Sequence, residues 1–316
     1  MSSLQEKIEE SRRIAVLGHV NPDGDCVGSC LGIRNYIVSN YPGTSVTVFL
    51  ETPPLKFRYL TGYDSIRHSL KDAEERYSLL ICLDCGDAGR TGDFAPLLTR
   101  GDYVYTVDHH ITNKGFGDAW TICPEAGSTS EILCDLLDMD RINRETAECF
   151  YTGIIHDTGV FRYSATSTHT METAGQLIDK GVDFTRIIEE SFYAKTYPQM
   201  RLLGYSLEHS ELHYGGKVIS SVITWKEMKQ FKVTSEDMDG IAEKLREVDG
   251  ADCSVFLHQT GEDSFKISMR SKHIVDVSRV AAAFGGGGHV RAAGCRMKGT
   301  AGEILEKLLN KAGEQL

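Results

Sequence analysis

The stretch YVYTVDHH at residues 103–110 joins an apolar, β-rich run to an aspartate and two histidines. The run Tyr103–Val107 shows no polar alternation, which is typical of a strand in a parallel sheet that is covered on both faces. Two adjacent histidines after an aspartate at a strand end are hard to explain by packing. The stretch therefore predicts a buried parallel strand that carries a polar site at its carboxyl end, the alternative being a loop with incidental histidines.

Similar runs precede this stretch and helical patterns surround it. Further strands are predicted at Arg13–Gly18, Ser45–Leu50 and Ser78–Leu83, and helices at Val27–Asn40, Ser128–Leu137 and Arg144–Ile155. Alternating strands and helices predict an α/β fold with a doubly wound, mainly parallel sheet. In such folds the ligand binds at the carboxyl ends of the strands.

The pattern changes in the last third of the chain, so that two domains are expected. We predict a catalytic domain at residues 1–191, a linker at 192–208 and a smaller α/β domain at 209–316. The smaller domain is expected to contain a strand at Lys217–Thr224, a helix at Ser235–Val248, a hairpin of Ala251–His258 and Ser264–Arg270, and helices at Asp276–Phe284 and Thr300–Lys311.

Composition limits the class of protein. The 316 residues carry a formal net charge of −11, which favours short substrates over long nucleic acid, because proteins that grip long nucleic acid usually show a basic face. No apolar run approaches the roughly 20 residues that cross a bilayer. The segment Met1–Arg13 lacks the apolar core of a signal peptide, and the nine scattered cysteines read as reduced. We therefore expect a cytoplasmic protein without a membrane partner.

Other strand and helix ends carry the same kinds of side chain. The residues concerned are His19, Asp23, Asp25, Asp84 and Asp157. Imidazole and carboxylate ligands suit ions of the manganese, magnesium or iron type, and one bridging carboxylate can hold two ions about 3.5–4 Å apart. Taken singly, each position has a plainer explanation as a solvated turn, a helix cap or a helix terminator. Cys82 and Cys85 flank Asp84, where a redox pair or a zinc site is the alternative.

These residues, in this order, resemble the motifs of the DHH phosphoesterase superfamily. The likeness runs from His19-x-x-Pro22-Asp23-x-Asp25-x-x-Gly28-Ser29, through Asp84 and Asp108-His109-His110, to Asp157. The segment GGGGHVRAAG at residues 285–294 resembles the signature of the associated DHHA1 domain. One departure is Cys26, where the family commonly has alanine.

The resemblance implies a site with two divalent ions, usually manganese. His19 and Asp23 would hold one ion, Asp25, His109 and Asp157 the other, and Asp84 would bridge them. The ions would activate a water molecule and neutralise charge on the phosphate. His110 would face the substrate phosphate, and Asp108 would orient a neighbouring side chain. Asp84, His110 and Asp108 are thus the expected catalytic residues.

The resemblance also implies that the second domain grips the substrate. Its glycine-rich loop would bring backbone N–H groups close to a phosphate. The expected substrate contacts are Arg270, Ser271, Gly286, Gly287, Gly288 and His289. A flexible turn is the alternative for the glycines alone.

Among relatives, the chain looks like the group of stand-alone oligoribonucleases and 3′-phosphoadenosine-5′-phosphate phosphatases. It lacks the membrane and signalling segments of membrane-bound cyclic-dinucleotide phosphodiesterases and is shorter than RecJ-type exonucleases. We expect manganese-dependent hydrolysis of short oligoribonucleotides and nucleoside 3′,5′-bisphosphate, by a protein that forms a homodimer. The alternatives are an exopolyphosphatase-like enzyme, a linear- or cyclic-dinucleotide phosphodiesterase and a non-catalytic nucleotide-binding protein.

Overall fold

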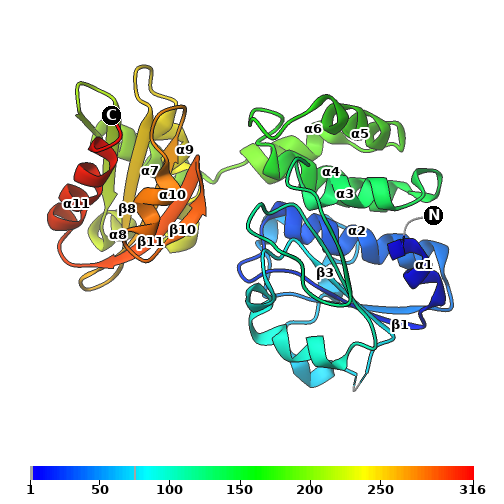
Figure 1. The fold of residues 1–316 in the computed structure, drawn as a ribbon. Helices are drawn as coiled ribbons and strands as arrows, with labels where there is room; N and C mark the ends of the chain where they lie inside the picture. The colour runs from blue at the N-terminus through cyan, green and yellow to red at the C-terminus, as the bar shows by residue number, and fades with distance from the viewer. Residues whose placement is uncertain (1–2, 75) are drawn as a thin grey trace. The chain divides into compact units, whose positions relative to one another are not determined.

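The computed structural model describes residues 3–74 and 76–316 and divides the chain into two compact units, Met1–Ala194 and Lys195–Leu316 (Figure 1). The stretch expected to be a linker, residues 192–208, differs from that expectation. It contains helix α7 (Tyr197–Glu208), which starts at a capping box of Thr196 and Gln199. Leu202 of this helix is fully buried in a core of the second unit, so the helix packs as part of that unit.

The first unit is built on a five-stranded parallel sheet in the order β2-β1-β3-β4-β5. The strands are β1 (Arg13–Leu17), β2 (Ser45–Phe49), β3 (Leu79–Leu83), β4 (Val104–Asp108) and β5 (Ala119–Ile122). The register pairs Leu17 with Cys82 and Leu83 with Val107, so that the carboxyl ends of the central strands lie at one edge. The predicted strands are therefore present; β5 was not predicted, because it is a short edge strand with half-exposed side chains.

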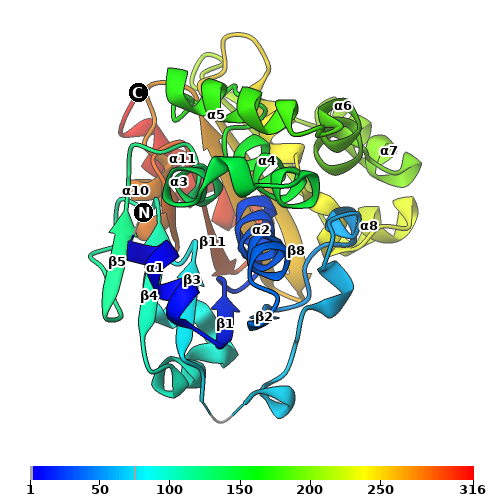
Figure 2. The same ribbon diagram turned by 90° about the vertical axis from the view of Figure 1, so that its right-hand side faces the viewer.

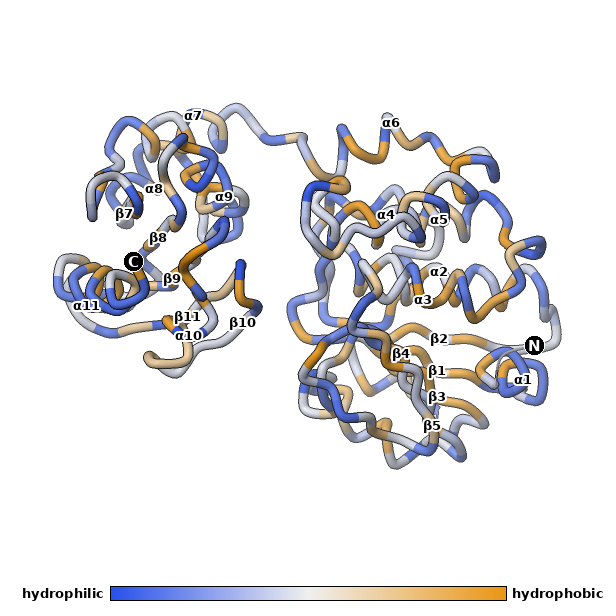
Figure 3. The backbone as a smooth tube through the Cα atoms, turned by 45° about the horizontal axis from the view of Figure 1, so that its top comes forward, coloured by the Kyte–Doolittle hydropathy of each residue, from blue (hydrophilic) through white to orange (hydrophobic). Residues whose placement is uncertain are grey.

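Helices cover one face of this sheet, as Figures 2 and 3 show. α2 (Gly24–Asn40), α3 (Thr129–Leu136) and α4 (Arg144–Asp157) share a core with the strands. The opposite face packs against the 3-10 turns η4 (Ala88–Arg100), which contribute Phe94 and Leu97. Gly92 and Pro96 interrupt this segment, which explains why it forms short turns and no α-helix.

Further elements complete the first unit. They are α1 (Ser3–Glu10), η1 (Leu55–Phe57), η2 (Tyr63–Ser65), η3 (Leu70–Asp72), η5 (Met139–Arg141), α5 (Thr168–Asp179), α6 (Phe184–Ile187) and the π-helical turn η6 (Ile188–Tyr193). None of these was predicted. Among the described residues, no helix is both long and apolar enough to cross a membrane.

The second unit is a mixed six-stranded sheet with helices on both faces. Its strands, in spatial order, are β10 (Gly287–His289), β11 (Ala292–Lys298), β9 (Ser264–Ser271), β8 (Cys253–Gly261), β7 (Val218–Ile223) and β6 (Glu211–His213). Its helices after α7 are α8 (Trp225–Phe231), η7 (Ser235–Met238), α9 (Ile241–Arg246), α10 (Val277–Ala282) and α11 (Ala301–Gly313). The single helix predicted at 235–248 is wrong, because Gly240 adopts a left-handed conformation (φ 87°) and separates η7 from α9.

A buried histidine on β8 predicts acid sensitivity of the second unit. His258 is 2% exposed, and neither ring nitrogen has a hydrogen-bond partner among the described residues. Burial, together with the charges of Lys266 and Arg296, lowers its pKa from 6.5 to about 4. The unfolded chain therefore binds the proton first, so that stability is complete above pH 6.5 and is lost as the pH falls toward 4.

We expect the free energy of unfolding of wild-type protein to fall by roughly 3 kcal/mol over this range through His258 alone. His258→Phe should remove that part of the pH dependence, as measured by denaturant unfolding at pH 7 and pH 4.5. The exposed His273 is the control position, and His273→Phe should keep the wild-type slope. An unchanged slope in His258→Phe would contradict a buried, neutral imidazole.

Candidate metal centre

Four polar residues lie at the carboxyl ends of adjacent strands, as their places in the sequence predicted. His19 follows β1, Asp84 follows β3, Asp108 is the last residue of β4, and His109 continues from it. β1 and β3 are neighbours at the point where the strand order reverses, which is where open α/β sheets bind ligands. Asp84 has a φ of 56°, an unusual value for a residue other than glycine and one often found at functional sites.

The Asp84 carboxylate lies at the centre of the cluster and is 2% exposed. Its Oδ2 lies 3.3 Å from Nε2 of His19, and its Oδ1 lies 3.6 Å from Nε2 of His109. The two oxygens thus face histidines that come from different strands. This arrangement is compatible with a carboxylate that contacts a cation on each side.

Hydrogen bonds to the backbone orient both histidines. Nδ1 of His19 lies 2.8 Å from the carbonyl oxygen of Val20, and Nδ1 of His109 lies 3.4 Å from that of Ala126. Since a carbonyl only accepts, each Nδ1 donates its proton to the backbone, which leaves each Nε2 as the nitrogen that would bind a cation beside Asp84. Metal-binding histidines are commonly held in this way.

Asp25 and Asp157 complete the acidic side of the cluster around His109. Ligand atoms of these three residues lie within 4.8 Å of one another, and Nε2 of His109 lies 3.0 Å from Oδ2 of Asp157. Asp25 reaches this place from the first turn of α2, and Asp157 from the last turn of α4. The carboxylate of Asp25 also accepts hydrogen bonds from the backbone N–H groups of Thr129 and Ser130 at the start of α3.

The cluster concentrates negative charge in a buried place. Burial raises the pKa of Asp25 well above its usual range, and the charges of Asp84 and Asp157 raise it further. Burial also raises the pKa of Asp157 to about 6, although the adjacent His109 lowers it. A cation bound here would relieve the repulsion among these three carboxylates.

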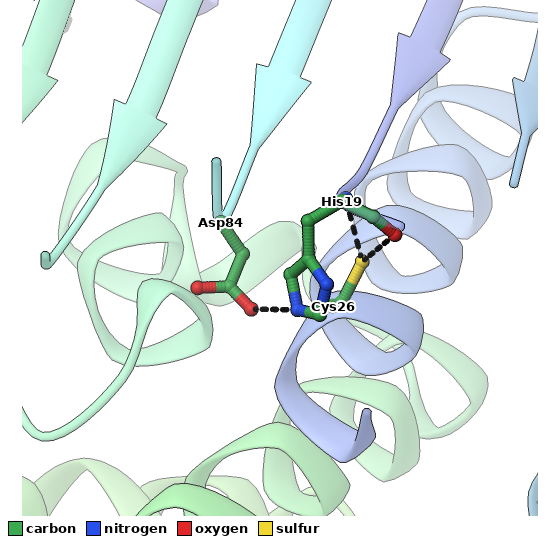
Figure 4. Close-up of side chains that lie close together, drawn as sticks. All are labelled: His19, Cys26 and Asp84. Carbon is green, nitrogen blue, oxygen red and sulfur yellow. Dashed lines mark hydrogen bonds and ion pairs between the residues drawn. The ribbon is translucent and has the colours of Figure 1, made fainter. Parts of the chain in front are cut away.

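Asp23 and Cys26 lie on the side of the cluster that contains His19, and their contacts give them different roles. Oδ1 of Asp23 lies 3.6 Å from Nε2 of His19 and also accepts from the backbone N–H groups of Asp25 and Cys26, so Asp23 caps α2 as well. The thiol of Cys26 lies close to His19 and Asp84, so that these three side chains could together hold a metal ion (Figure 4). Its sulfur, however, faces the backbone N–H of His19 at 3.2 Å, and burial raises the pKa of the thiol well above its usual range.

Because a neutral, buried thiol is a poor ligand, Cys26→Ala is expected to keep both metal binding and activity within about twofold of wild type. The variant should lose roughly 1 kcal/mol of stability, because the sulfur fills space beside Gly18. Calorimetric titration with Mn²⁺ and steady-state kinetics measure the two properties. A tenfold loss of metal affinity would instead make Cys26 a ligand.

Beside the cluster, Asp108 orients His110 through a hydrogen bond. Oδ1 of Asp108 lies 2.7 Å from Nδ1 of His110, and its Oδ2 accepts from Nδ2 of Asn113 at 2.7 Å. Asp108 is fully buried, whereas the side chain of His110 is 26% exposed. Burial opposes the charged form of Asp108, but the His110 contact outweighs it and lowers the pKa of Asp108. The Nδ1 proton of His110 is thereby committed to Asp108, and Nε2 is the nitrogen that can serve a ligand.

The donor set fits divalent cations of the hard or borderline kind. It combines carboxylate oxygens with imidazole nitrogens and includes no ionised thiol, which is typical of manganese, magnesium or iron sites. The sequence-predicted ligands are brought together at one edge of the sheet. They are His19, Asp23, Asp25, Asp84, His109 and Asp157.

The second unit contains a cavity of about 590 Å³ at the predicted substrate-gripping residues. Arg270 and Gly286–Gly288 line it, and a Cβ atom on Gly286 would lie 2.2 Å from the carbonyl oxygen of Gly294, so only glycine fits there. Ser271 differs, since its side chain is 1% exposed and its hydroxyl lies 3.4 Å from both Val290 O and Arg291 Nη1. A phosphate contact by Ser271 or His289, neither of which lines the cavity, stays a prediction.

Some residues of the site were not predicted. Arg90, from η4, places Nη2 3.3 Å from Nδ1 of His19, and the hydroxyl of Thr129 lies 3.3 Å from Asp84. Asn113 supports Asp108, as described above. No motif signals these residues, because each is brought to the site by the path of a loop or by a helix that starts elsewhere in the chain.

The sequence of this chain is similar to those of known proteins. Residues 13–154 match the profile of the DHH family, N-terminal domain, and residues 215–316 match that of the DHHA1 domain. The bifunctional oligoribonuclease and PAP phosphatase NrnA of Thermus thermophilus is 30% identical over 307 residues, which is 96% of this chain and 90% of that protein. The cyclic-di-AMP phosphodiesterase GdpP of Bacillus subtilis is 25% identical over 99% of this chain, but over only 49% of its own length.

A solved structure has the same fold. The exopolyphosphatase-related protein from Bacteroides fragilis superposes with a TM-score of 0.91 and 26% identity, over 98% of this chain and 94% of that one. Both units of the present chain therefore have counterparts in one known protein.

Proposed function

The chain belongs to the DHH family of phosphoester hydrolases, and from this premise we propose that it hydrolyses short oligoribonucleotides and nucleoside 3′,5′-bisphosphates with the help of two divalent ions, physiologically Mn²⁺. The observation that carries the proposal is the position of Asp84. Its two oxygens face Nε2 of His19 and Nε2 of His109, each of which has its Nδ1 bonded to the backbone.

The proposed division of ligands follows these contacts. His19 and Asp23 would hold one ion, Asp25, His109 and Asp157 would hold the other, and Asp84 would contribute to both. When bound, the ions would supply positive charge for the phosphate and acidity for a water nucleophile. The protein's own contribution is to hold the ligands rigidly. Asp23 accepts the capping hydrogen bonds of α2, and Asp25 accepts hydrogen bonds from the backbone N–H groups at the start of α3.

His110 is proposed to hold the phosphate at the reacting centre. Asp108 keeps the Nδ1 proton in place and favours the protonated ring, since it raises the pKa of His110 against the effect of burial. A doubly protonated imidazole donates from Nε2 to a phosphate oxygen and stabilises the charge that develops there.

The substrate class rests on the second unit and on the relatives. Arg270 and the backbone of Gly286–Gly288 offer a cation and close-approach N–H groups to a terminal phosphate. The Thermus thermophilus relative, similar over nearly the whole chain, bears the name of an oligoribonuclease and PAP phosphatase. A linear- or cyclic-dinucleotide phosphodiesterase is the second candidate, favoured by the similarity to GdpP.

A hydrolysis panel with Mn²⁺ tests the proposal. We expect dinucleotides, RNA of three to five nucleotides and the 3′,5′-bisphosphate to be cleaved faster than cyclic dinucleotides, long RNA and polyphosphate, and EDTA to abolish cleavage. Faster turnover of a cyclic dinucleotide or of polyphosphate would show that the proposed substrate class is wrong. Nucleotide binding without hydrolysis of any phosphoester would overturn the enzyme itself.

A further inference from the structure

The exposed side of strands β9 and β11 carries cations other than Arg270, which is the cation proposed to contact a terminal phosphate. Side chains alternate along β9, so that Lys266, Ser268 and Arg270 lie on the same face. In the register of the two strands, Arg296 pairs with Lys266 and Gly294 pairs with Ser268. Lys266 and Arg296 are both exposed and line the same cavity as Arg270 and the glycine loop.

The pairing of Lys266 with Arg296 is unfavourable for the protein alone. Like charges directly opposite each other in a sheet repel, and among the described residues neither cation forms a hydrogen bond or an ion pair. The residue that pairs with Lys266 on the other side, His258 of β8, gives no relief, because the nearby cations and its burial lower its pKa to about 4 and keep it neutral. An anionic ligand would remove this repulsion.

Arg270 is less isolated than the other two cations. Its Nε lies 3.7 Å from Oε2 of Glu243, so its charge is partly compensated within the unit. The uncompensated positive charge of the cavity therefore lies at Lys266 and Arg296. Arg296 is two residues along β11 from Gly294, which pairs with Gly287 of the glycine segment.

We propose that Lys266 and Arg296 form a second phosphate subsite, which binds a phosphodiester of an oligonucleotide further along the chain than the phosphate at Arg270. This inference rests on the proposed function. It assigns the length preference of the enzyme to two residues of the second unit.

The spacing of the groups favours an oligonucleotide over a polyphosphate. Lys266 and Arg270 are four residues apart, which is roughly 13 Å along a strand. The uncharged Ser268 and Gly294 lie between the two charged positions. A ligand whose phosphates are separated by nucleosides fits this pattern, whereas polyphosphate would place several charges over the uncharged stretch.

The test compares wild type with the double variant Lys266→Gln/Arg296→Gln. We expect the ratio of kcat/KM for a five-nucleotide RNA to that for the 3′,5′-bisphosphate to fall roughly tenfold. For the five-nucleotide RNA, the slope of log(kcat/KM) against log salt concentration should become shallower by about 1.4, because two contacts to single-stranded phosphate are lost.

A charge-matched control is Lys307→Gln/Lys311→Gln on α11, which packs against the opposite face of the sheet. Its ratio and salt slope should equal those of wild type. An unchanged ratio in Lys266→Gln/Arg296→Gln, in a wild type that cleaves both substrates, overturns the subsite alone. A wild type that cleaves neither substrate overturns the proposed function, and a selective loss of polyphosphate cleavage assigns the subsite to a different ligand.

Discussion

Asp84→Asn is expected to lower kcat/KM by about 10⁴-fold with Mn²⁺ present, because the two proposed ions would both lose the ligand that they would share. The substitution keeps the size of the side chain and removes its charge. Since Asp84 is buried at the meeting point of His19 and His109, no other described side chain can take its place from the surface. We also expect Mn²⁺ to raise the Tm of wild type and not that of Asp84→Asn, which is a readout that does not depend on turnover.

Asp93→Asn is the matched control for this variant. Asp93 is exposed, lies on the η4 turns that follow β3, and has no ionic partner among the described residues. Its Tm shift and kinetics should equal those of wild type. Near-normal turnover in Asp84→Asn would show that the two ions, if both bind, do not share this carboxylate.

The sequence predicted this centre well where polar residues directly follow apolar strands. Asp84 and Asp108–His110 are examples, since the carboxyl ends of parallel strands must meet at one edge. It predicted supporting contacts poorly. The hydrogen bond that the N–H of Thr129 donates to Asp25 joins residues 104 positions apart and depends on how α2 and α3 pack. No local pattern encodes such a contact.

In the second unit, secondary structure and strand register were also only partly predictable from the sequence. An amphipathic pattern predicted one helix at 235–248, but Gly240 breaks it, and a single glycine is a weak signal against a long apolar periodicity. The opposition of Lys266 and Arg296 required the register of β9 and β11, which depends on pairing across strands and not on either strand alone.

Asp108→Asn is expected to lower kcat by about 10²-fold to 10³-fold with little effect on Mn²⁺ binding. An asparagine at this position can present N–H where His110 needs an acceptor, so that the ring loses its fixed proton on Nδ1. The Mn²⁺-dependent rise in Tm should persist, in contrast to Asp84→Asn, because Asp108 contacts His110 and Asn113 and none of the proposed ligands. Steady-state kinetics and thermal unfolding with and without Mn²⁺ measure both effects.

A double-mutant cycle with His110→Ala separates positioning from a general loss of structure. If Asp108 acts through His110, the double variant should be no slower than His110→Ala alone, and the two single effects should not add. The pH profile of kcat should separate the variants too, because Asp108 raises the pKa of His110. In Asp108→Asn the ring should therefore lose its proton at a lower pH, and the alkaline limb of the profile should shift to lower pH. Additive losses with an unmoved alkaline limb would mean that Asp108 supports the strand end itself, and that the orientation of His110 is set elsewhere.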